Sequence, residues 1–265
     1  MRAGARTADI IVIGAGVVGA SIAFHLARRK AGRVLVLDKG LAAQGSSSRS
    51  SALVRMHYTL PQEVQLARRS LEIFTSWEDY VGRPGCFKRL GFIRLVPASE
   101  VESLKRNVAM QRALGVNTRL VSAQEVKEIE PDWRVDDIEV AAYEPDSGYG
   151  DGAVTARDLL ERAVEMGAEF RPRTRVLGYE VEAGRVRGVA TERGSLASPV
   201  VVAAAGPWSP ALFRGLDFAL PIEPEFHRVA ILLQLAEEKE PGLRFHRQQK
   251  VAVEWRRGGT PAPAR

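Results

Sequence analysis

The sequence predicts an α/β fold that contains a Rossmann-like dinucleotide-binding domain. Ile10–Ile13 is a short apolar run of the kind that forms a buried strand, and Val34–Leu37 is a second one that ends at Asp38. Between them the glycines follow the spacing G-x-G-x-x-G, at Gly14, Gly16 and Gly19. A strand, a glycine turn, a helix and a distal acid in this order are typical of a βαβ unit that binds a dinucleotide.

Each glycine of this motif has a separate physical role. Gly14 permits the tight turn after the strand, and Gly16 lets the backbone approach a pyrophosphate. Gly19 lets the helix that begins at Val17 pack closely against the strand. The free N–H groups and the positive end of the helix dipole favour a phosphate at this position.

Asp38 bears on which nucleotide binds. Its carboxylate accepts hydrogen bonds from ribose hydroxyls and repels the 2′-phosphate of NADP, so FAD and NAD remain. Lys39 follows directly, and on its own it is typical of a solvated strand end. After Asp38 the chain has a long mixed segment and a three-stranded meander before its next buried strand. That order favours FAD over a simple NAD-binding fold.

The rest of the chain contains further predicted helices and strands. Helices are expected over residues 62–80, 99–114 and 122–129, and a capping box at 155–158 predicts another helix that ends at Gly167. Strands are expected at 90–96, 168–170, 176–181, 186–190 and 199–206. The three strands from 168 to 190 form the expected meander, and the strand at 199–206 is expected to be buried.

Composition excludes several classes of protein. The 265 residues are 45% hydrophobic and 26% charged, as in a soluble globular protein. No apolar run reaches the length of a membrane span and no cleavable signal is recognised, so a cytoplasmic protein is expected. Cys86 is the only cysteine, so neither an intrachain disulfide nor a metal site is expected. The net charge of +6 comes from scattered basic residues, which argues against nucleic-acid binding.

Four segments together resemble the D-amino-acid oxidase superfamily of FAD-dependent oxidoreductases. They are the fingerprint at 14–38, SSSRSSALVR at 46–55, PDSGYGDG at 145–152 and VVVAAAGPWS at 200–209. The branch that they resemble includes glycine oxidase, sarcosine oxidase (monomeric or β subunit) and D-amino-acid dehydrogenase. The resemblance covers roughly residues 8–230. It implies a Rossmann-like FAD-binding domain and an α+β substrate domain built on an antiparallel sheet.

The resemblance also implies which residues hold FAD, without a covalent bond because Cys86 does not lie where the family attaches flavin. At the pyrophosphate and ribose it implies Gly14, Gly16, Val17, Val18, Gly19, Asp38 and Lys39, with Ser46 and Ser47 at the phosphate and ribityl region. Around the rings it implies Ser51, Ala52 and Leu53, the main chain of Val176, and Ala204, Ala205 and Gly206. A flexible loop remains the alternative for the serines, and an ordinary core strand with a terminal turn for 203–206. Trp208 is expected to pack on the sheet, with packing on the flavin as the alternative.

The substrate-site candidates are Arg55, His57 and Tyr58. In the sarcosine-oxidase branch an arginine at the end of this stretch pairs with the substrate carboxylate, and a guanidinium group suits that planar anion. A structural or surface salt bridge is the alternative for Arg55. His57 and Tyr58 follow directly and are candidates for lining the pocket, with a structural role as the alternative for His57.

The implied function is oxidation of the C–N bond of a small amino acid or secondary amine, of the glycine, sarcosine or D-amino-acid type. Hydride transfer to flavin N5 gives an imine that water hydrolyses, and the cofactor carries the difficult chemistry. The electron acceptor can be oxygen, a quinone or a partner subunit. Two alternatives remain open: a truncated, inactive flavin-binding remnant, and a 2-hydroxy-acid or glycerol-phosphate oxidoreductase of related fold.

The predicted domains alternate along the chain. Residues 1–85 and 143–215 are expected to form the FAD-binding domain, and residues 86–142 and 216–265 the substrate domain, with an irregular tail after about Leu235. Members of the family usually run to a greater length, so a truncated or frame-shifted chain with an incomplete substrate domain is expected, with a genuine short terminus as the alternative. A partner chain that carries the missing segment would make it one subunit of a hetero-oligomer.

Overall fold

The computed structural model describes residues 7–225, 231–233 and 249–251. The chain divides into two compact units, Met1–Ile222 and Glu223–Arg265. In the second unit, β14 (Ile231–Leu233) pairs antiparallel with β15 (Gln249–Val251). The tail predicted as irregular therefore contains a strand at β15, and the rest of that prediction lies outside the described residues. The domain boundaries stay predictions.

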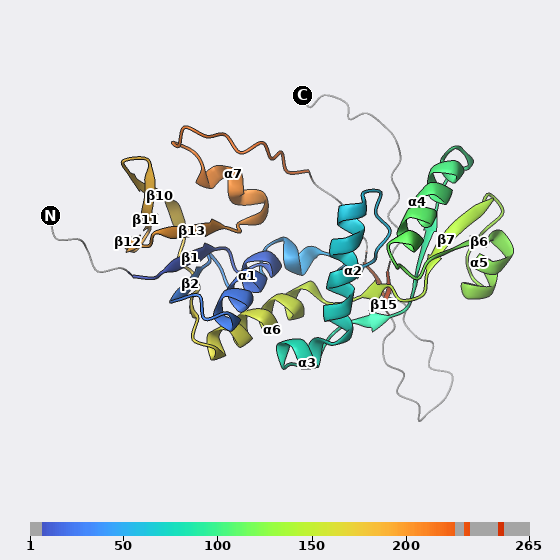
Figure 1. Cartoon of the computed structure of the whole chain (residues 1–265), viewed down its shortest axis with the longest axis horizontal. Helices are drawn as coiled ribbons and strands as arrows, with labels where there is room; N and C mark the ends of the chain where they lie inside the picture. The colour runs from blue at the N-terminus through green and yellow to red at the C-terminus, as the bar shows by residue number, and fades with distance from the viewer. Residues whose placement is uncertain (1–6, 226–230, 234–248, 252–265) are drawn as a thin grey trace. The chain divides into compact units, whose positions relative to one another are not determined.

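A four-stranded parallel sheet is the framework of one part of the first unit (Figure 1), with the order β13-β1-β2-β9. Strands β1 (Ile10–Ile13) and β2 (Val34–Leu37) have the bounds predicted from their apolar runs. Strand β13 (Val200–Ala203) pairs with the other edge of β1, and β9 (Glu169–Arg171) pairs with β2. In register, Ile13 lies beside Leu37 on one side and Ala203 on the other.

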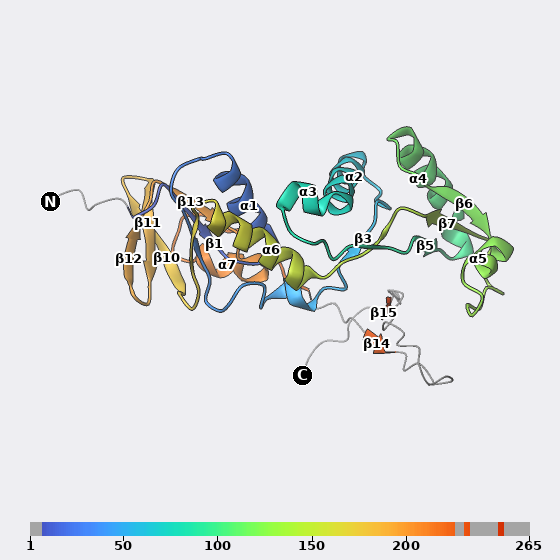
Figure 2. The same cartoon turned by 90° about the horizontal axis from the view of Figure 1, so that it is seen from below.

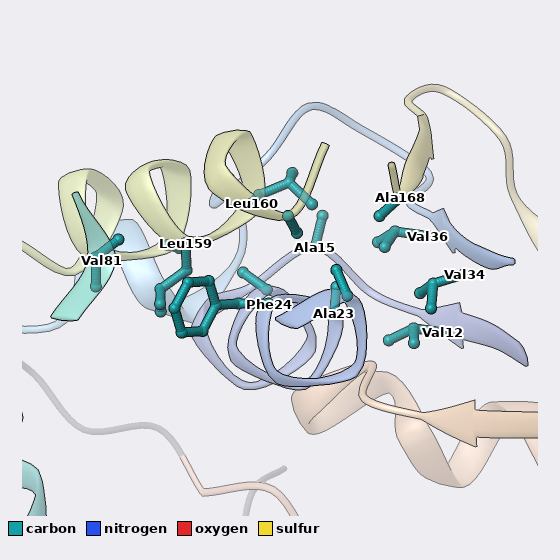
Figure 3. Close-up of a cluster of buried hydrophobic side chains, with 14 of the residues drawn as sticks. Val12, Ala15, Ala23, Phe24, Val34, Val36, Val81, Leu159, Leu160 and Ala168 are labelled. Carbon is teal, nitrogen blue, oxygen red and sulfur yellow. The ribbon is translucent and has the colours of Figure 1, made fainter. Parts of the chain in front are cut away.

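One face of this sheet is covered by α1 (Val17–Arg28) and α6 (Gly152–Glu165), which pack against each other. Side chains alternate between the two faces of a strand, so Val12, Val34 and Val36 point toward these helices. Figure 3 shows Phe24 of α1 beside Leu159 of α6, within this cluster. The small residues Ala20, Ala23 and Ala27 let α1 lie close to the strands.

The opposite face is covered by an antiparallel meander of β10 (Val176–Glu182), β11 (Arg185–Thr191) and β12 (Gly194–Ala197). Its residues Val176 and Val189 are buried against Ile11, Leu35 and their neighbours in β1 and β2. The predicted turn between β10 and β11 is confirmed, since Ala183 and Gly184 both have positive φ.

Two predictions about these strands are wrong. The strand at 168–170 was expected in the meander, but β9 joins the parallel sheet and the third meander strand is β12. The strand at 199–206 was expected to be buried, but Val200 is 47% exposed and the rest of β13 is half-buried. Its place at the edge of the described sheet leaves β13 paired only with β1.

Two small antiparallel sheets form the other part of the first unit (Figure 2). The first has the order β3-β8-β4, with β3 at Leu53–Val54, β8 at Gly148–Tyr149 and β4 at Lys88–Arg89. The second has the order β5-β7-β6, with β5 at Phe92–Leu95, β7 at Val140–Glu144 and β6 at Arg119–Ser122. Of these six strands, the sequence predicted β5 as a strand and β3 as part of an extended stretch.

The helices of this part have the predicted positions with one break. Helices α4 (Val101–Ala113) and α5 (Ala123–Ile129) fall within the predicted ranges, and a capping box of Ser122 and Glu125 begins α5. The single helix expected at 62–80 is two, α2 (Pro61–Thr75) and α3 (Trp77–Val81). The break comes at Ser76, whose hydroxyl donates back to the carbonyl of Glu72 at 2.7 Å.

The predicted start of α6 is also wrong. Helix α6 begins at Gly152, and its cap is Asp151, whose Oδ1 accepts the N–H groups of Ala153 and Val154. Thr155 lies within the first turn and donates its hydroxyl to the carbonyl of Asp151. The predicted end is confirmed, because Gly167 follows α6 with φ of +100°.

Short helical turns complete the described elements: η1 (Ser46–Arg49), η2 (Ala98–Glu100), η3 (Gly206–Trp208) and α7 (Ser209–Leu212). Within the described ranges, no helix is long and apolar enough to cross a membrane. Nor do three His, Cys, Asp or Glu side chains gather there in a way that could hold a metal ion.

Substitutions in α6 test the packing of this core. Leu160 is 3% exposed and Val164, one turn later, is 44% exposed. We expect Leu160→Ala to lower the free energy of unfolding by about 2–5 kcal/mol, because it leaves a cavity in the core. We expect Val164→Ala to change it by less than about 0.5 kcal/mol. Chemical denaturation of both variants is the measurement, and equal losses would contradict the described packing of α6.

Candidate nucleotide and substrate site

The carboxyl ends of three neighbouring parallel strands meet at one edge of the four-stranded parallel sheet. The register of β1, β2 and β13 brings Gly14, Asp38 and Ala204 together directly after those strands. The N–H of Gly14 donates to the carbonyl of Leu37 at 2.7 Å, and the N–H of Ala204 donates to the carbonyl of Ile13 at 2.8 Å. In open parallel α/β sheets, ligands bind outside this end of the strands.

The close approach of the backbone at this edge requires two of the glycines. Gly14 has φ of +109°, and a Cβ there would lie 2.3 Å from the carbonyl oxygen of Ala204. A Cβ on Gly19 would lie 1.9 Å from the carbonyl oxygen of Gly14. The interpretation of Gly14 as the turn glycine and Gly19 as the helix-packing glycine is therefore confirmed.

The start of α1 is arranged to receive an anion. Gly16 is its N-cap and supplies no side-chain cap, and the first turn carries no acidic residue. The N–H of Val17 donates to the hydroxyl of Ser47 at 2.9 Å, while Val18 is 58% exposed. A Cβ on Gly16 would face the same hydroxyl at 3.2 Å. A helix N-terminus of this kind favours a phosphate, and here Ser47 already accepts the N–H of Val17 beside it.

Asp38 is held in a fixed orientation next to this helix start. Its Oδ2 accepts the N–H of Ala15 at 2.7 Å, and its Oδ1 accepts the N–H of Gly40 at 2.8 Å. Each carboxylate oxygen has two lone pairs, so both can accept a further hydrogen bond from a ribose hydroxyl. Half-buried and fixed by the backbone, the carboxylate needs no reorganisation to meet a ligand.

Lys39 contacts Trp208 across the same edge. Its ammonium lies over the indole ring at 3.9 Å from the centroid, and Gly45 also lies against that ring. The prediction that Trp208 packs on the sheet is wrong, because Trp208 is 43% exposed and contacts Lys39 and the loop at Gly45. These contacts tie the loop after β2 to the turn after β13.

The serine-rich segment is brought to α1 by the turn that precedes α6. A Cβ on Gly152 would lie 2.3 Å from the carbonyl oxygen of Ser47, and the N–H of Gly150 donates to the carbonyl of Ala52 at 3.0 Å. Ala52 has φ of +51°, an uncommon conformation for alanine. Leu53 pairs with Tyr149 in β8, whereas Ser46 is exposed and Ser51 half-buried. The segments at 46–55 and 145–152, two of the four that carry the resemblance to the family, therefore lie in direct contact.

The remaining cofactor candidates lie on β10 and after β13. The side chain of Val176 is buried in the core beneath the meander, and its backbone lies opposite Thr191 in the pairing of β10 with β11. Ala204 packs against the core of α1 and α6, and Ala205 packs against the opposite core. Gly206 is exposed with φ of +55°. The contacts of these residues with a cofactor stay predictions.

Arg55, His57 and Tyr58 form one cluster directly after β3. The guanidinium of Arg55 donates to the carbonyl of His57 and lies 4.8 Å from the ring centroid of Tyr58 and 5.5 Å from that of Phe92. Arg55 and Tyr58 are half-buried, whereas His57 is 8% exposed. Among the described residues, no carboxylate lies within ion-pair distance of Arg55, and the role of Arg55 stays a prediction.

Two buried polar residues that the sequence reading missed hold this cluster. Glu144, at the end of β7, accepts the N–H of Met56 at 3.0 Å, and its other oxygen lies 3.6 Å from Nδ1 of His57. Gln111 of α4 donates to the carbonyl of Tyr58 at 3.1 Å. The sequence held a signal for Glu144. This residue lies at the end of an apolar stretch, directly before the PDSG turn, where an acidic residue is uncommon unless its carboxylate has a specific partner. Nothing local distinguishes Gln111.

Comparisons with known proteins agree with this geometry. A sequence model described as FAD dependent oxidoreductase (DAO) matches residues 9–260. The mitochondrial pyruvate dehydrogenase phosphatase regulatory subunit of Mus musculus is 27% identical over 221 residues, which are 83% of this chain and 25% of that protein. The sarcosine oxidase subunit beta of Arthrobacter sp is 26% identical over 225 residues, 82% of this chain and 56% of that protein.

Among solved structures, L-proline dehydrogenase from P. horikoshii superimposes with a TM-score of 0.77 at 31% identity, covering 83% of this chain and 59% of that one. The chain thus spans between a quarter and about three fifths of the length of these proteins. The likeness confirms the α/β fold with its parallel and antiparallel sheets and the resemblance to sarcosine oxidase. Since the family match extends over most of its length, the chain belongs to the DAO family of FAD-dependent oxidoreductases.

Proposed function

We propose that this chain binds FAD and oxidises the C–N bond of a small amino acid or secondary amine. The observation that carries the proposal is the shared edge of β1, β2 and β13, where the start of α1 and the carboxylate of Asp38 lie side by side. This edge fits the dinucleotide half of FAD. Gly16, Val17 and Val18 would hold the pyrophosphate, and Asp38 would hold the adenosine ribose.

Arg55 is the proposed anchor for the substrate. It is half-buried, and Nη1 donates to the carbonyl of His57, the single hydrogen bond that Arg55 makes within the described part of the chain. A guanidinium group has five N–H donors, so several remain for the two oxygens of a substrate carboxylate. The aromatic rings of Tyr58 and Phe92 restrict where the guanidinium can point.

The chemistry is divided between cofactor and protein. Bound FAD supplies the acceptor for the hydride that leaves the carbon bearing the amine. Arg55 fixes the carboxylate, and with it the position of that carbon. Water hydrolyses the resulting imine to an oxo compound and a free amine. Tyr58 lines the substrate side, while the burial of His57 against Glu144 favours the structural alternative for that residue.

A partner chain is part of the proposal. The Arthrobacter relative is a subunit by name. The described residues supply the nucleotide edge and the Arg55 cluster, which are part of the expected active site. We therefore propose that the protein works in the cytoplasm as one subunit of a hetero-oligomer. Its reduced flavin would pass electrons to oxygen, a quinone or a partner subunit.

A second candidate is a flavin-binding chain without catalytic turnover. The mouse relative is a regulatory subunit by name and covers 83% of this chain, so the same framework occurs in a protein named for regulation. A flavin that binds and is never reduced would favour this candidate. Reduction by a 2-hydroxy acid in place of an amine would favour C–O oxidation.

The experiment that tests the proposal is the visible spectrum of the purified chain, followed by anaerobic addition of substrates. The panel is sarcosine, glycine, proline and D-alanine, with lactate and glycerol 3-phosphate to detect C–O oxidation. Bleaching of the flavin band by one of the amines is the expected result. A flavin that no amine reduces would contradict amine oxidation.

Gly19 and Gly178 give a matched test of the nucleotide site. A Cβ on Gly19 collides with the Gly14 carbonyl, whereas a Cβ on Gly178 in β10 meets nothing within 4 Å. We expect Gly19→Ala to weaken FAD binding at least about tenfold, because a displacement that costs ~1.4 kcal/mol is enough for that factor. Gly178→Ala should bind as the parent chain does. Calorimetric titration with FAD is the measurement, and unchanged affinity in Gly19→Ala would contradict the site.

Arg55 and Arg94 give a matched test of the substrate anchor. Arg94 lies on β5, the strand that also carries Phe92, and it is exposed. We expect Arg55→Met to lower kcat/KM about 10- to 100-fold, since hydrogen bonds to a charged group contribute ~1.5–3 kcal/mol. Arg94→Met should leave it unchanged. Anaerobic reduction kinetics with the best amine measure both variants, and equal activity of Arg55→Met and the parent would remove Arg55 from the site.

A further inference from the structure

We propose that Glu144 is a positioning residue that holds Arg55 ready to bind a carboxylate. It acts through the backbone of Met56 and the imidazole of His57. The guanidinium of Arg55 donates to the carbonyl of His57. The inference deepens the proposed function, because it takes Arg55 as the substrate anchor.

Glu144 is fully buried, with 0% of its surface exposed, and it is tied to the segment after β3. Its Oε2 accepts the N–H of Met56 at 3.0 Å and the hydroxyl of Ser147 at 2.7 Å. Met56 is the residue directly after Arg55. Burying a carboxylate is costly unless it is paired and hydrogen-bonded, so these bonds fix where Arg55 leaves the sheet.

The second carboxylate oxygen points to the imidazole of His57. Oε1 of Glu144 lies 3.6 Å from Nδ1 of His57, which is an ion-pair distance, and neither atom has a hydrogen-bond partner within the described structure. The His57 ring also lies 6.3 Å from the ring of Phe92, which is the register partner of Glu144. His57 is thereby enclosed by Glu144 and Phe92.

Arg55 rests on the parts that Glu144 fixes. Its guanidinium donates to the carbonyl of His57 and lies over Phe92 and Tyr58. Nε2 of Gln111 donates to the carbonyl of Tyr58 at 3.1 Å. The backbone from Met56 to Tyr58 is therefore fixed at both ends by buried side chains. A guanidinium on such a support loses less freedom when it binds a planar anion.

The experiment measures carboxylate binding in the flavin-loaded chain, with acetate as the probe and acetamide as its uncharged control. Perturbation of the flavin absorbance gives the Kd of each. We expect Glu144→Gln to raise the Kd of acetate about tenfold, within the range of coupling energies for residues in one network. The Kd of acetamide should not change. Glu139→Gln, an exposed acid just before β7, is the matched control and should behave as the parent chain does.

A double-mutant cycle separates positioning from general damage. In the Arg55→Met background, Glu144→Gln should have no further effect on acetate binding. Equal effects in both backgrounds, or an equal loss of acetamide binding, would overturn the proposal. Should Glu144→Gln fail to fold, Ser147→Ala removes a single bond to Glu144 and is expected to raise the Kd of acetate alone; no change there would overturn the proposal as well.

The cycle also separates the role of Arg55 as the substrate anchor from the role of Glu144 as its positioning residue. If the parent chain binds acetate and Arg55→Met does not, Arg55 is the anchor, and an unaltered Kd in Glu144→Gln overturns the role of Glu144 alone. If Arg55→Met binds acetate as the parent chain does, the anchor role in the proposed function fails first.

Discussion

The parallel register of β1, β2 and β13 is the constraint on which the rest of the structure depends. It brings three strand ends to one edge. That edge forms only because Gly14 and Gly19 have no Cβ: a Cβ there would lie 2.3 Å and 1.9 Å, respectively, from a backbone carbonyl oxygen. With the glycines in place, the start of α1 lies beside Asp38, which is already oriented by two backbone N–H groups. The same close approach thus shapes both the core and the candidate nucleotide site.

The substrate side is built differently, from segments far apart in the sequence. Arg55 directly follows β3, a two-residue strand whose backbone pairs with β8 at only two positions. Buried polar groups from β7 and α4 replace that pairing, through Glu144 on Met56 and Gln111 on Tyr58. Because a buried polar group is costly unless it is satisfied, such contacts favour one arrangement of the loop strongly.

The sequence was informative where structure is local. The first 38 residues predicted β1, α1, β2 and the roles of the glycines, since each follows from apolar runs, spacing and turn chemistry. The two-residue strands β3, β4 and β8 are too short to show a period. Strand β9 was predicted as a strand but placed in the wrong sheet, because its partner β2 lies more than a hundred residues away in the sequence. Glu144 was missed for the same reason, as its partner Met56 is 88 residues away. The start of α6 was misread because Asp151 and Thr155 both carry capping chemistry, and only the folded chain shows which one caps.

The central claim is that the described edge binds the adenosine diphosphate half of FAD, and competition tests it most directly. FAD bound to the chain would be titrated with ADP and, separately, with FMN, and the fraction displaced followed by flavin fluorescence. The account predicts that ADP displaces FAD, because the pyrophosphate and ribose contacts come from α1 and Asp38. Displacement by FMN with no effect of ADP would contradict it.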